Sequence, residues 1–593
     1  MKHPITERLA ALRQLMAQNH ITATVIPQND AHMSEYLSPF WQVRRFFSGF
    51  TGSAGDLVVT ADKALLWTDS RYFLQAAQQL ADSGIVLMKD GLHETPSIAS
   101  WLVSELRNGG TVGIDGMLFS IQARNDLENR LQAEGISLVT TFDPAQVWND
   151  RPTLPQGKIF VHDIKYAGLG AAAKISNVLL NAAAQKAPAV FISALDEIAW
   201  VLNIRSNDVS YNPVATSFLY LSKDRNVLFI DPVKVPADVA DYLASQGVTC
   251  RPYSDVKTWL GALPADARVL VDASRTSAAI ASVLGTRCVA GTSPVAMLKA
   301  CKNDAQLEGL RDAMLRDGVA MVKSLHSIIT DVRAGRPLTE LDVADILRTN
   351  RAASPLFFDE SFGTIAGYGP HGAIVHYEAD ADSAAALEPH GLLLIDSGAQ
   401  YYDGTTDITR TISLGVQPTE QERHDFTLVM KGHIALARAI FPAGTVGMQL
   451  DALARQYLWR EGLAYLHGTG HGVGHFLNVH EGPQSIRLNY VPAPLTPGMV
   501  TSNEPGLYRE GIHGIRCENL VLTVPAATTE FGQFLQFETL TLCPFDRSLF
   551  DVSIMTPEEI AWINAYHALV AEKLTPLLDA SDAEWLAEQT AAL

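Results

Sequence analysis

In the first half of the chain, short apolar runs alternate with stretches whose apolar residues recur at helical spacing, such as 98–106 and 124–133. Runs of this length and composition are typical of buried strands. Three of them recur in the same order, at offsets that drift from 166 to 157 residues: 23–26 and 189–192, 65–69 and 227–231, and 112–115 and 269–272. The pattern predicts two α/β domains related by duplication, at 1–157 and 158–302.

The pattern changes after residue 302. A long amphipathic stretch covers 303–332, the sequence Ala-Gly-Arg-Pro interrupts it, and a second helix is predicted at 338–349. We expect a third domain at 303–530 and, at 531–593, an extension that packs on it and combines a β-rich run with helices. Two dipeptide pairs with equal internal spacing indicate that the third domain consists of two related halves: 334–335 with 341–342, and 443–444 with 450–451.

The N-terminal segment carries Leu9, Leu12, Leu15 and Met16 at helical spacing, with charged residues between them. Charges at these positions do not suit the unbroken apolar run of an export signal, so we expect a surface helix. No uncharged apolar stretch of about 18 residues occurs, and the sequence therefore predicts no membrane partner.

Composition and charge narrow the classes of function. The 593 residues exceed what one core normally supports, and 47% apolar with 18% charged residues is typical of globular domains. A formal net charge of −19 disfavours nucleic acid as a partner. Five cysteines without metal-type spacing favour free thiols, and we expect a cytoplasmic protein.

The first candidate site residues are two aspartates. Asp396 follows four apolar residues of a predicted strand, and Asp407 is expected on the next strand, beyond a turn at Asp403-Gly404. Burying an unpaired carboxylate costs several kcal/mol. We therefore expect a cation beside Asp396.

A cluster of histidines alternating with glycines comes next. Glycine lets the backbone approach closely, and the imidazoles then project from it. Any one histidine has a structural interpretation, which we favour for His475, but the cluster as a whole indicates chemistry. Its members are His467, His471, His475 and His480, with glycine at 468, 470, 472 and 474.

Two glutamates complete the set. Glu504 and Glu518 are expected on neighbouring strands, and taken alone both would be interpreted as ion-pair partners, with Arg516 the mate of one of them. Combined with Asp396, Asp407 and His471, they form a hard, oxygen-rich donor set with too many ligands for one tetrahedral zinc. Two metals that share bridging carboxylates would use all five, as in aminopeptidases and phosphatases.

The segments IDSGAQYYDGTTDITRT, HGTGHGVGHFLNVHEGP, SNEPGLY and GIRCENLVL resemble the Xaa-Pro aminopeptidases of the pita-bread metallopeptidase family. RRFFSGFTGSAG and WTDSRYF, near the N-terminus, are similar to segments of the same family. Nearly the whole chain is covered, and the three-domain, cytosolic type is the most similar. The implied fold is two creatinase-like α/β domains followed by a pita-bread catalytic domain. The implied substrates are peptides with proline in the second position, and the implied assembly is a homodimer.

The resemblance also implies a ligand set. One metal would be held by Asp407, His471, Glu504 and Glu518, and the other by Asp396, Asp407 and Glu518, so that Asp407 and Glu518 bridge. The usual metal is Mn²⁺, with Zn²⁺ or Co²⁺ as alternatives. A bridging hydroxide would attack the carbonyl of the first residue, and Glu504 would move a proton toward the leaving nitrogen.

Further roles follow from the same resemblance. His376 and His480 would contact the substrate and stabilise the tetrahedral intermediate, and His467 would be a third histidine beside the site. Arg516 would orient the bridging Glu518.

Four residues depart from the family's pattern or lie beside the ligands without a role. His371, His475 and His513 are local variants that bear on fine specificity rather than on the reaction. Cys517 should point to the face opposite Arg516 and Glu518, as a packed thiol.

Three other functions share this fold. Prolidase has the same ligands but cleaves dipeptides, and the large N-terminal domains and the tail favour the aminopeptidase. Peptide- or histone-binding modules and creatinase-type enzymes work without the metals. Retention of all five ligands disfavours both.

Overall fold

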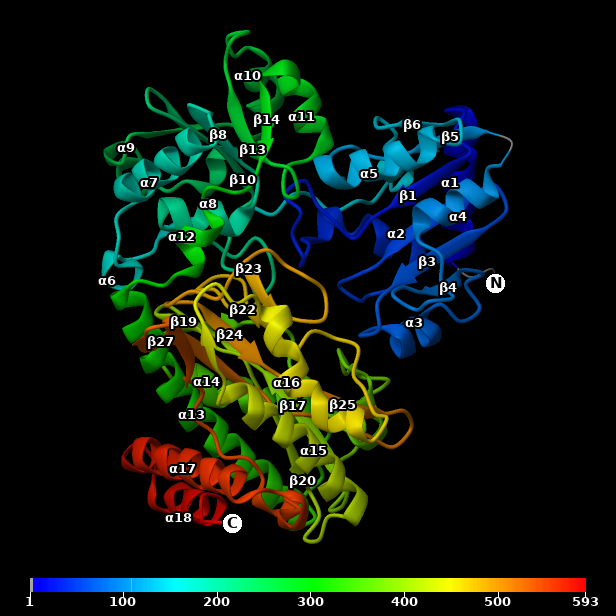
Figure 1. Cartoon of the computed structure of the whole chain (residues 1–593). Coiled ribbons are helices and arrows are strands. Elements are labelled where there is room, and N and C mark those ends of the chain that lie inside the picture. The colour runs from blue at the N-terminus through cyan, green and yellow to red at the C-terminus, as the bar shows by residue number, and fades with distance from the viewer. Residues whose placement is uncertain (1–3, 108) are drawn as a thin grey trace. The chain divides into compact units, whose positions relative to one another are not determined.

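The computed structural model describes residues 4–107 and 109–593, and the chain divides into two compact units. Unit 1 comprises the residues up to Ile164 together with Leu169–Val295, and unit 2 comprises Lys165–Gly168 together with Ala296–Leu593. Figure 1 shows the elements of both units by label and colour. Across the described residues, no helix combines the length and the apolar character needed to cross a bilayer.

Unit 1 contains two mixed sheets with the same topology, ordered β4-β3-β2-β1-β5-β6 and β12-β11-β10-β8-β13-β14. In each, a central strand pairs antiparallel with the next strand and parallel with a strand that follows a crossover. The repeated runs predicted from the sequence occupy equivalent strands of the two sheets. The first sheet consists of β1 (Ala23–Ile26), β2 (Asp56–Thr60), β3 (Ala64–Thr68), β4 (Val86–Lys89), β5 (Gly110–Gly113) and β6 (Ile136–Val139). The second consists of β8 (Ala189–Ile192), β10 (Ser217–Ser222), β11 (Asn226–Ile230), β12 (Val248–Arg251), β13 (Val269–Asp272) and β14 (Cys288–Gly291).

Helices cover both sheets of unit 1. The predicted N-terminal helix is confirmed as α1, which buries Leu9, Leu12 and Met16 while Arg13 donates to the Thr60 carbonyl at 2.9 Å. The helices predicted at 98–106 and 124–133 are confirmed as α4 and α5. The main helices are α1 (Pro4–Gln18), α2 (Val43–Ser48), α3 (Phe73–Gln79), α4 (Ile98–Glu105), α5 (Ile121–Gln132), α7 (Ala171–Ala184), α8 (Leu195–Leu202), α9 (Ala237–Ser245), α10 (Val256–Gly261) and α11 (Ala278–Leu284).

The main part of unit 2 begins with α12 (Ala296–Ala300) and the long helix α13 (Asp304–Arg333). A capping box between Asn303 and Gln306 stabilises the N-terminus of α13. The two helices predicted from the amphipathic pattern are confirmed as α13 and α14 (Glu340–Ala352). The second half of the domain repeats this arrangement with α15 (Glu420–Ala437) and α16 (Gly447–Arg460), which pack on each other as α13 and α14 do. In each pair, the first matching dipeptide lies in the connection between the two helices and the second lies in the first turns of the following helix.

Several curved sheets lie among these helices. The antiparallel pair that carries the aspartates is β17 (Leu392–Ser397) and β20 (Ile408–Ser413), with β16 (Ile365–Tyr368) at its edge. A small sheet contains β15 (Phe357–Glu360), β18 (Ala399–Tyr401) and β19 (Gly404–Thr405). The largest is ordered β21 (Ile440–Pro442), β28 (Gly532–Thr539), β27 (Asn519–Thr529), β24 (Val500–Asn503), β22 (Gly470–Gly472) and β23 (Glu481–Ile486). A separate hairpin joins β25 (Gly506–Arg509) to β26 (His513–Arg516).

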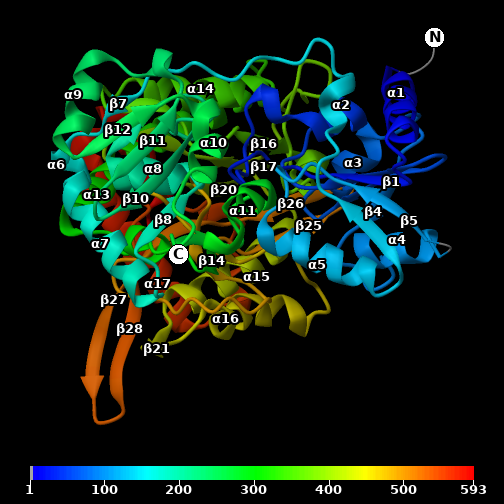
Figure 2. The same ribbon diagram turned by 90° about the horizontal axis from the view of Figure 1, so that it is seen from above.

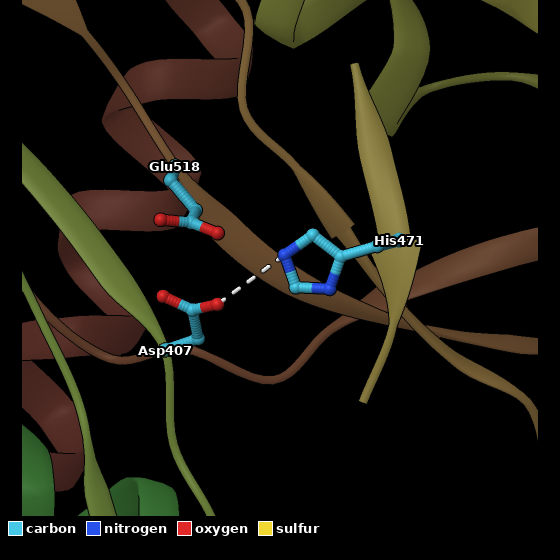
Figure 3. A group of neighbouring side chains, drawn as sticks. All are labelled: Asp407, His471 and Glu518. Atoms are coloured by element: carbon cyan, nitrogen blue, oxygen red, sulfur yellow. Dashed lines mark ion pairs between the residues drawn. The ribbon is translucent and has the colours of Figure 1, made fainter. Parts of the chain in front are cut away.

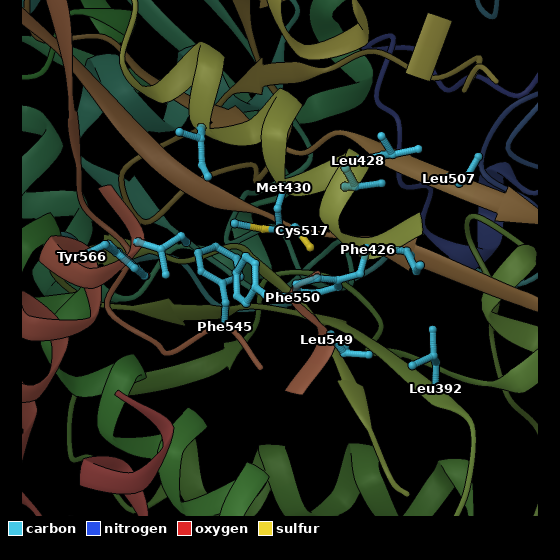
Figure 4. Close-up of a cluster of buried hydrophobic side chains, with 14 of the residues drawn as sticks. Leu392, Phe426, Leu428, Met430, Leu507, Cys517, Phe545, Leu549, Phe550 and Tyr566 are labelled. Atoms are coloured by element: carbon cyan, nitrogen blue, oxygen red, sulfur yellow. The ribbon is translucent and has the colours of Figure 1, made fainter. Parts of the chain in front are cut away.

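The C-terminal segment contributes both to this sheet and to the core. Strands β27 and β28 form one long hairpin that projects beyond β21 and α16 (Figure 2), and this hairpin spans the domain boundary predicted at residue 530. Helix α17 (Pro557–Leu574) is followed by α18 (Ala580–Gln589). Figure 4 shows Tyr566 of α17 in one buried cluster with Phe426 of α15, Phe545 and Cys517. Cys517 thus packs among apolar side chains, as predicted, and burial raises its pKa to about 12.

Candidate metal centre

Strand β17 and its partner β20 bring the two aspartates together. Asp396 pairs in register with Thr409, and Asp407 lies one residue before β20 begins. The predicted turn is also found, since β18 and β19 pair on either side of Asp403. Asp407 was expected inside a strand but lies in the link between β19 and β20. In a strand, side chains point alternately to the two faces of the sheet. In the connection between two strands, the Asp407 side chain is not held to this alternation and can point toward the centre.

His471 lies on β22, between β23 and β24, where the backbones are too close for larger residues. A Cβ on Gly470 would come within 2.0 Å of the Ser502 carbonyl oxygen, and one on Gly472 within 2.2 Å of the Glu481 carbonyl oxygen. The His471 Nδ1 donates to the Gly472 carbonyl at 2.9 Å. That bond fixes the tautomer and leaves Nε2 as the atom that faces the carboxylates.

The candidate ligands converge from strand ends that are distant in sequence. Glu504 follows β24 and Glu518 precedes β27, and these strands pair beside them, with Asn503 opposite Asn519. The His471 Nε2 lies 3.5 Å from Asp407 Oδ2 and 3.3 Å from Glu504 Oε1. One ligand atom each of Asp407, His471 and Glu518 lie within 4.8 Å of one another. Figure 3 shows the three side chains directed toward one another. The structure therefore brings these predicted ligands to one place.

Arg516 is the cation beside Asp396. Its Nη2 lies 2.6 Å from Asp396 Oδ2, and its Nε lies 3.1 Å from the same oxygen. Arg516 reaches Glu518 only through Thr409, whose hydroxyl donates to Glu518 Oε2 at 2.8 Å. The predicted role of Arg516 in orienting Glu518 would therefore act through Thr409, while the guanidinium itself bonds Asp396 of β17, a strand that packs against β26.

The carboxylates of the centre lack enough positive charge among the described residues. The buried oxygens Asp396 Oδ1 and Glu518 Oε1 have no hydrogen-bond partner there. Burial raises the pKa of Asp407 and of Glu518 well above the usual range, and repulsion from neighbouring carboxylates adds to the effect. Burial and the nearby Asp396 raise the pKa of Glu504 to about 7. Unpartnered, hard oxygen donors around one imidazole fit divalent metal ions.

Two histidines lie beside the ligands. The His480 ring meets the His471 ring edge to face, with centroids 4.4 Å apart. The His467 Nε2 lies 2.8 Å from the Tyr508 hydroxyl, and the Arg516 Nη1 donates to the same hydroxyl at 2.7 Å. His467 is therefore connected to the centre through Tyr508 and Arg516.

The remaining predicted site histidine is His376, which is half-buried and follows the short helix η6 (Gly369–Ala373). This helix packs against β17 and β26, the strands that carry Asp396 and Arg516. Its segment therefore lies beside the centre.

Family models match consecutive segments of the chain. "Metallopeptidase family M24" matches residues 308–525, and "C-terminal region of peptidase_M24" matches 533–593. The "Creatinase/Prolidase N-terminal domain" matches twice, at 8–144 and at 150–306.

Full-length relatives and a solved structure agree with these matches. "Aminopeptidase P2" of Arabidopsis thaliana is 42% identical, over 99% of this chain and 89% of its own length. "Probable Xaa-Pro aminopeptidase P" of Sordaria macrospora is 41% identical, over 99% of both chains. The crystal structure of X-prolyl aminopeptidase from Caenorhabditis elegans, described as a cytosolic enzyme with a di-nuclear active site, superposes with a TM-score of 0.95 at 36% identity, covering 99% of this chain and 100% of that one.

The chain belongs to the Xaa-Pro aminopeptidases of metallopeptidase family M24. It is a hydrolase, with creatinase-type N-terminal domains and a pita-bread catalytic domain. Both the fold class and the family expected from the motifs are confirmed.

One residue of this Xaa-Pro aminopeptidase site was missed in the sequence. Tyr508 is half-buried and lies between His467 and Arg516. It lies in the quoted motif SNEPGLY, but a single tyrosine without charge gives no signal of its own. His475, interpreted as structural, is buried with 2% of its surface exposed.

Proposed function

We propose that this chain removes the N-terminal residue from peptides with proline in the second position, using two divalent metal ions. The observation that carries the proposal is two buried carboxylate oxygens, Asp396 Oδ1 and Glu518 Oε1, that have no hydrogen-bond partner among the described residues. Asp407 and Glu518 would bridge the ions, Asp396 would complete one, and His471 with Glu504 the other. Manganese is the proposed metal, with zinc or cobalt as alternatives.

The reaction requires a specialised site because a proline nitrogen in a peptide bond carries no hydrogen. When bound, the two ions would supply a hydroxide nucleophile and polarise the scissile carbonyl. Glu504 would accept a proton and pass it to the leaving nitrogen. His376 and His480 would donate hydrogen bonds to the carbonyl oxygen as it becomes negative.

Arg516 and Tyr508 would hold the geometry. Arg516 holds Asp396 in place through two hydrogen bonds, and Tyr508 holds Arg516 and His467 in place. These contacts restrict the rotamers of the groups that act, which is the main requirement of a two-metal site.

Mass spectrometry of an Xaa-Pro-Yaa peptide tests the function. Metal-loaded enzyme should release one residue, and enzyme treated with a chelator should release none. The matched Xaa-Ala-Yaa peptide is the control, and equal cleavage of both peptides would contradict the proposed specificity. An Xaa-Pro dipeptide distinguishes prolidase, which would cleave the dipeptide in preference.

Alanine variants of the histidines test the roles. His471→Ala should lose metal and activity together. His376→Ala and His480→Ala should keep both ions while activity falls by roughly 10² to 10³, the usual cost of removing one oxyanion donor. His467→Ala should show a milder loss, and His475→Ala should retain activity within a few fold. Metal release from His376→Ala, or an inactive His475→Ala, would contradict these assignments.

We also propose a cytoplasmic location and a homodimer. The first is supported by the C. elegans enzyme, which is described as cytosolic, and by free cysteines throughout the described residues. The second rests on the family resemblance alone. Light scattering of the purified chain measures the oligomeric state directly.

A further inference from the structure

One buried carboxylate outside the metal centre collects four donors. Glu340, the first residue of α14, has no exposed surface. Its oxygens accept hydrogen bonds from the Tyr368 amide at 2.7 Å and the Ala385 amide at 2.8 Å. They also accept from the Tyr377 hydroxyl at 2.9 Å and from His371 Nδ1 at 2.9 Å. A single side chain thus binds both ends and the middle of the segment 368–385.

Those bonds do not serve the helix that carries Glu340. The N-terminus of α14 is already capped by a capping box between Thr339 and Asp342. The Glu340 backbone amide instead donates to the Ala385 carbonyl at 3.1 Å, which adds another link to the same segment. Helix capping therefore does not explain why this carboxylate is buried.

The segment 368–385 contains His376, next to Tyr377 and five residues after His371. Two of the four donors to Glu340 therefore flank His376 closely. The helix η6, at the start of the segment, also contacts β26 without an intervening side chain, because a Cβ on Gly514 would lie 1.6 Å from the Gly372 carbonyl oxygen. A displacement of this segment would move His376 relative to β26, which carries Arg516.

We propose that Glu340 is a positioning residue for the reaction, holding the segment 368–385 so that His376 faces the metal centre. This inference rests on the proposed function, in which His376 contacts the substrate. An ionised carboxylate accepts hydrogen bonds only, so it suits four donors at once. An amide in its place would direct an N–H group toward at least one of them.

The charge of Glu340 also stabilises its partner. The hydrogen bond to Glu340 raises the pKa of His371, and the proximity of the carboxylate adds to this. A protonated imidazole makes the bond to Glu340 charge-assisted, which strengthens it. His371, which departs from the family's pattern, thereby acquires a role in the same arrangement.

Amide hydrogen exchange tests the positioning without any substrate. In Glu340→Gln, amides within 368–385 should exchange at least roughly tenfold faster than in the parent enzyme, because opening of this segment no longer breaks the same bonds. Asp342→Asn is the matched control, since it weakens the cap of the same helix without removing a donor or acceptor of this segment. Equal exchange in Glu340→Gln and the parent would overturn the proposal.

Kinetics test whether the positioning acts through His376. On an Xaa-Pro-Yaa peptide, kcat of Glu340→Gln should fall roughly 10- to 100-fold, in line with misplacement of a catalytic group, while KM changes less than about threefold and both metals remain. In a His376→Ala background, the same substitution should cost less than about twofold. Additive losses in the double variant would overturn the role through His376.

A milder variant covers the case in which Glu340→Gln does not fold. Tyr377→Phe removes only the donor next to His376, and it should lower kcat in the same direction by a few fold. His371→Asn keeps an N–H donor and should retain activity within about threefold. An unchanged kcat in Tyr377→Phe would contradict the proposal. A parent enzyme inactive on every Xaa-Pro peptide would contradict the proposed function instead, while the exchange result would still decide the positioning.

Discussion

Two buried groups of charges in the catalytic unit differ in how they are neutralised. In the metal centre, the carboxylates share one arginine, and two of their oxygens have no partner among the described residues. At the start of β23, Glu481 is equally buried but has two lysines, with Lys299 Nζ and Lys302 Nζ each 2.6 Å from one of its oxygens. Burial alone therefore does not distinguish the two groups.

The two groups differ in whether positively charged side chains balance their carboxylates. The Glu481 cluster, defined as Lys299, Lys302 and Glu481, supplies its own cations, and desolvation lowers the pKa of Lys302. In the metal centre, burial and then repulsion between neighbouring carboxylates raise the pKa of Asp407 and of Glu518. A buried ionic group that is complete contributes to structure, whereas one that lacks counter-charge requires a ligand.

The largest effect is expected from the bridging carboxylates. Asp407→Asn and Glu518→Gln should each disturb both ions and reduce activity to background, because each carboxylate is assigned to two metals. Asp396→Asn should chiefly weaken one ion. Elemental analysis of the purified variants measures this, and loss of both ions in Asp396→Asn with retention in Asp407→Asn would reverse the assignment.

Glu481→Gln should destabilise the protein without acting on the metals directly. Removing one partner of a buried ion pair typically costs about 3 to 5 kcal/mol, and here it leaves two lysines without a counter-ion. Urea unfolding of the metal-free variant measures the loss. If the free energy of unfolding falls by less than about 1 kcal/mol, the Glu481 cluster does not stabilise the fold as its ion pairs indicate.

In metal-free protein, the charge of Glu504 should lower the stability of the fold, whereas the charge of Glu481 should raise it. Its pKa is about 7 when folded against 4.5 for an ordinary glutamate, so between these values the folded state binds the extra proton. The parent should then lose stability as pH rises from 4.5 to about 7, by on the order of 2 kcal/mol in total. Glu504→Gln should lose less stability over this range, because only the raised pKa values of Asp407 and Glu518 then contribute. Unfolding free energies of the two metal-free proteins at pH 4.5 and 7.5 test this prediction. A parent protein more stable at pH 7.5 than at pH 4.5 would contradict it.

Lys302→Met should have the smallest effect. The substitution leaves the Lys299–Glu481 pair intact and removes the excess positive charge of the cluster. Replacing a buried charge with an apolar side chain of similar volume is often neutral, so the change should stay below about 1 kcal/mol. Urea unfolding compares it with Glu481→Gln, and equal losses would mean that both lysines are required.

Local sequence patterns were sufficient for much of the fold. Helices α1, α13 and α14 follow from apolar spacing and from residues that cap helices, which act within one or two turns. The duplication in unit 1 also left a visible trace in its strands. These features depend on neighbours along the chain, and the sequence contains all of that information.

The candidate metal ligands could likewise be selected from the sequence, because acidic residues and histidine at the ends of apolar runs are costly without a chemical role. What only the tertiary structure decided is which groups meet. Arg516 binds Asp396, 120 residues away, rather than Glu518 two positions along. Glu340 meets Tyr377 across 37 residues. Such contacts depend on strand register and on the packing of segments distant in sequence, and the local pattern of residues does not determine them.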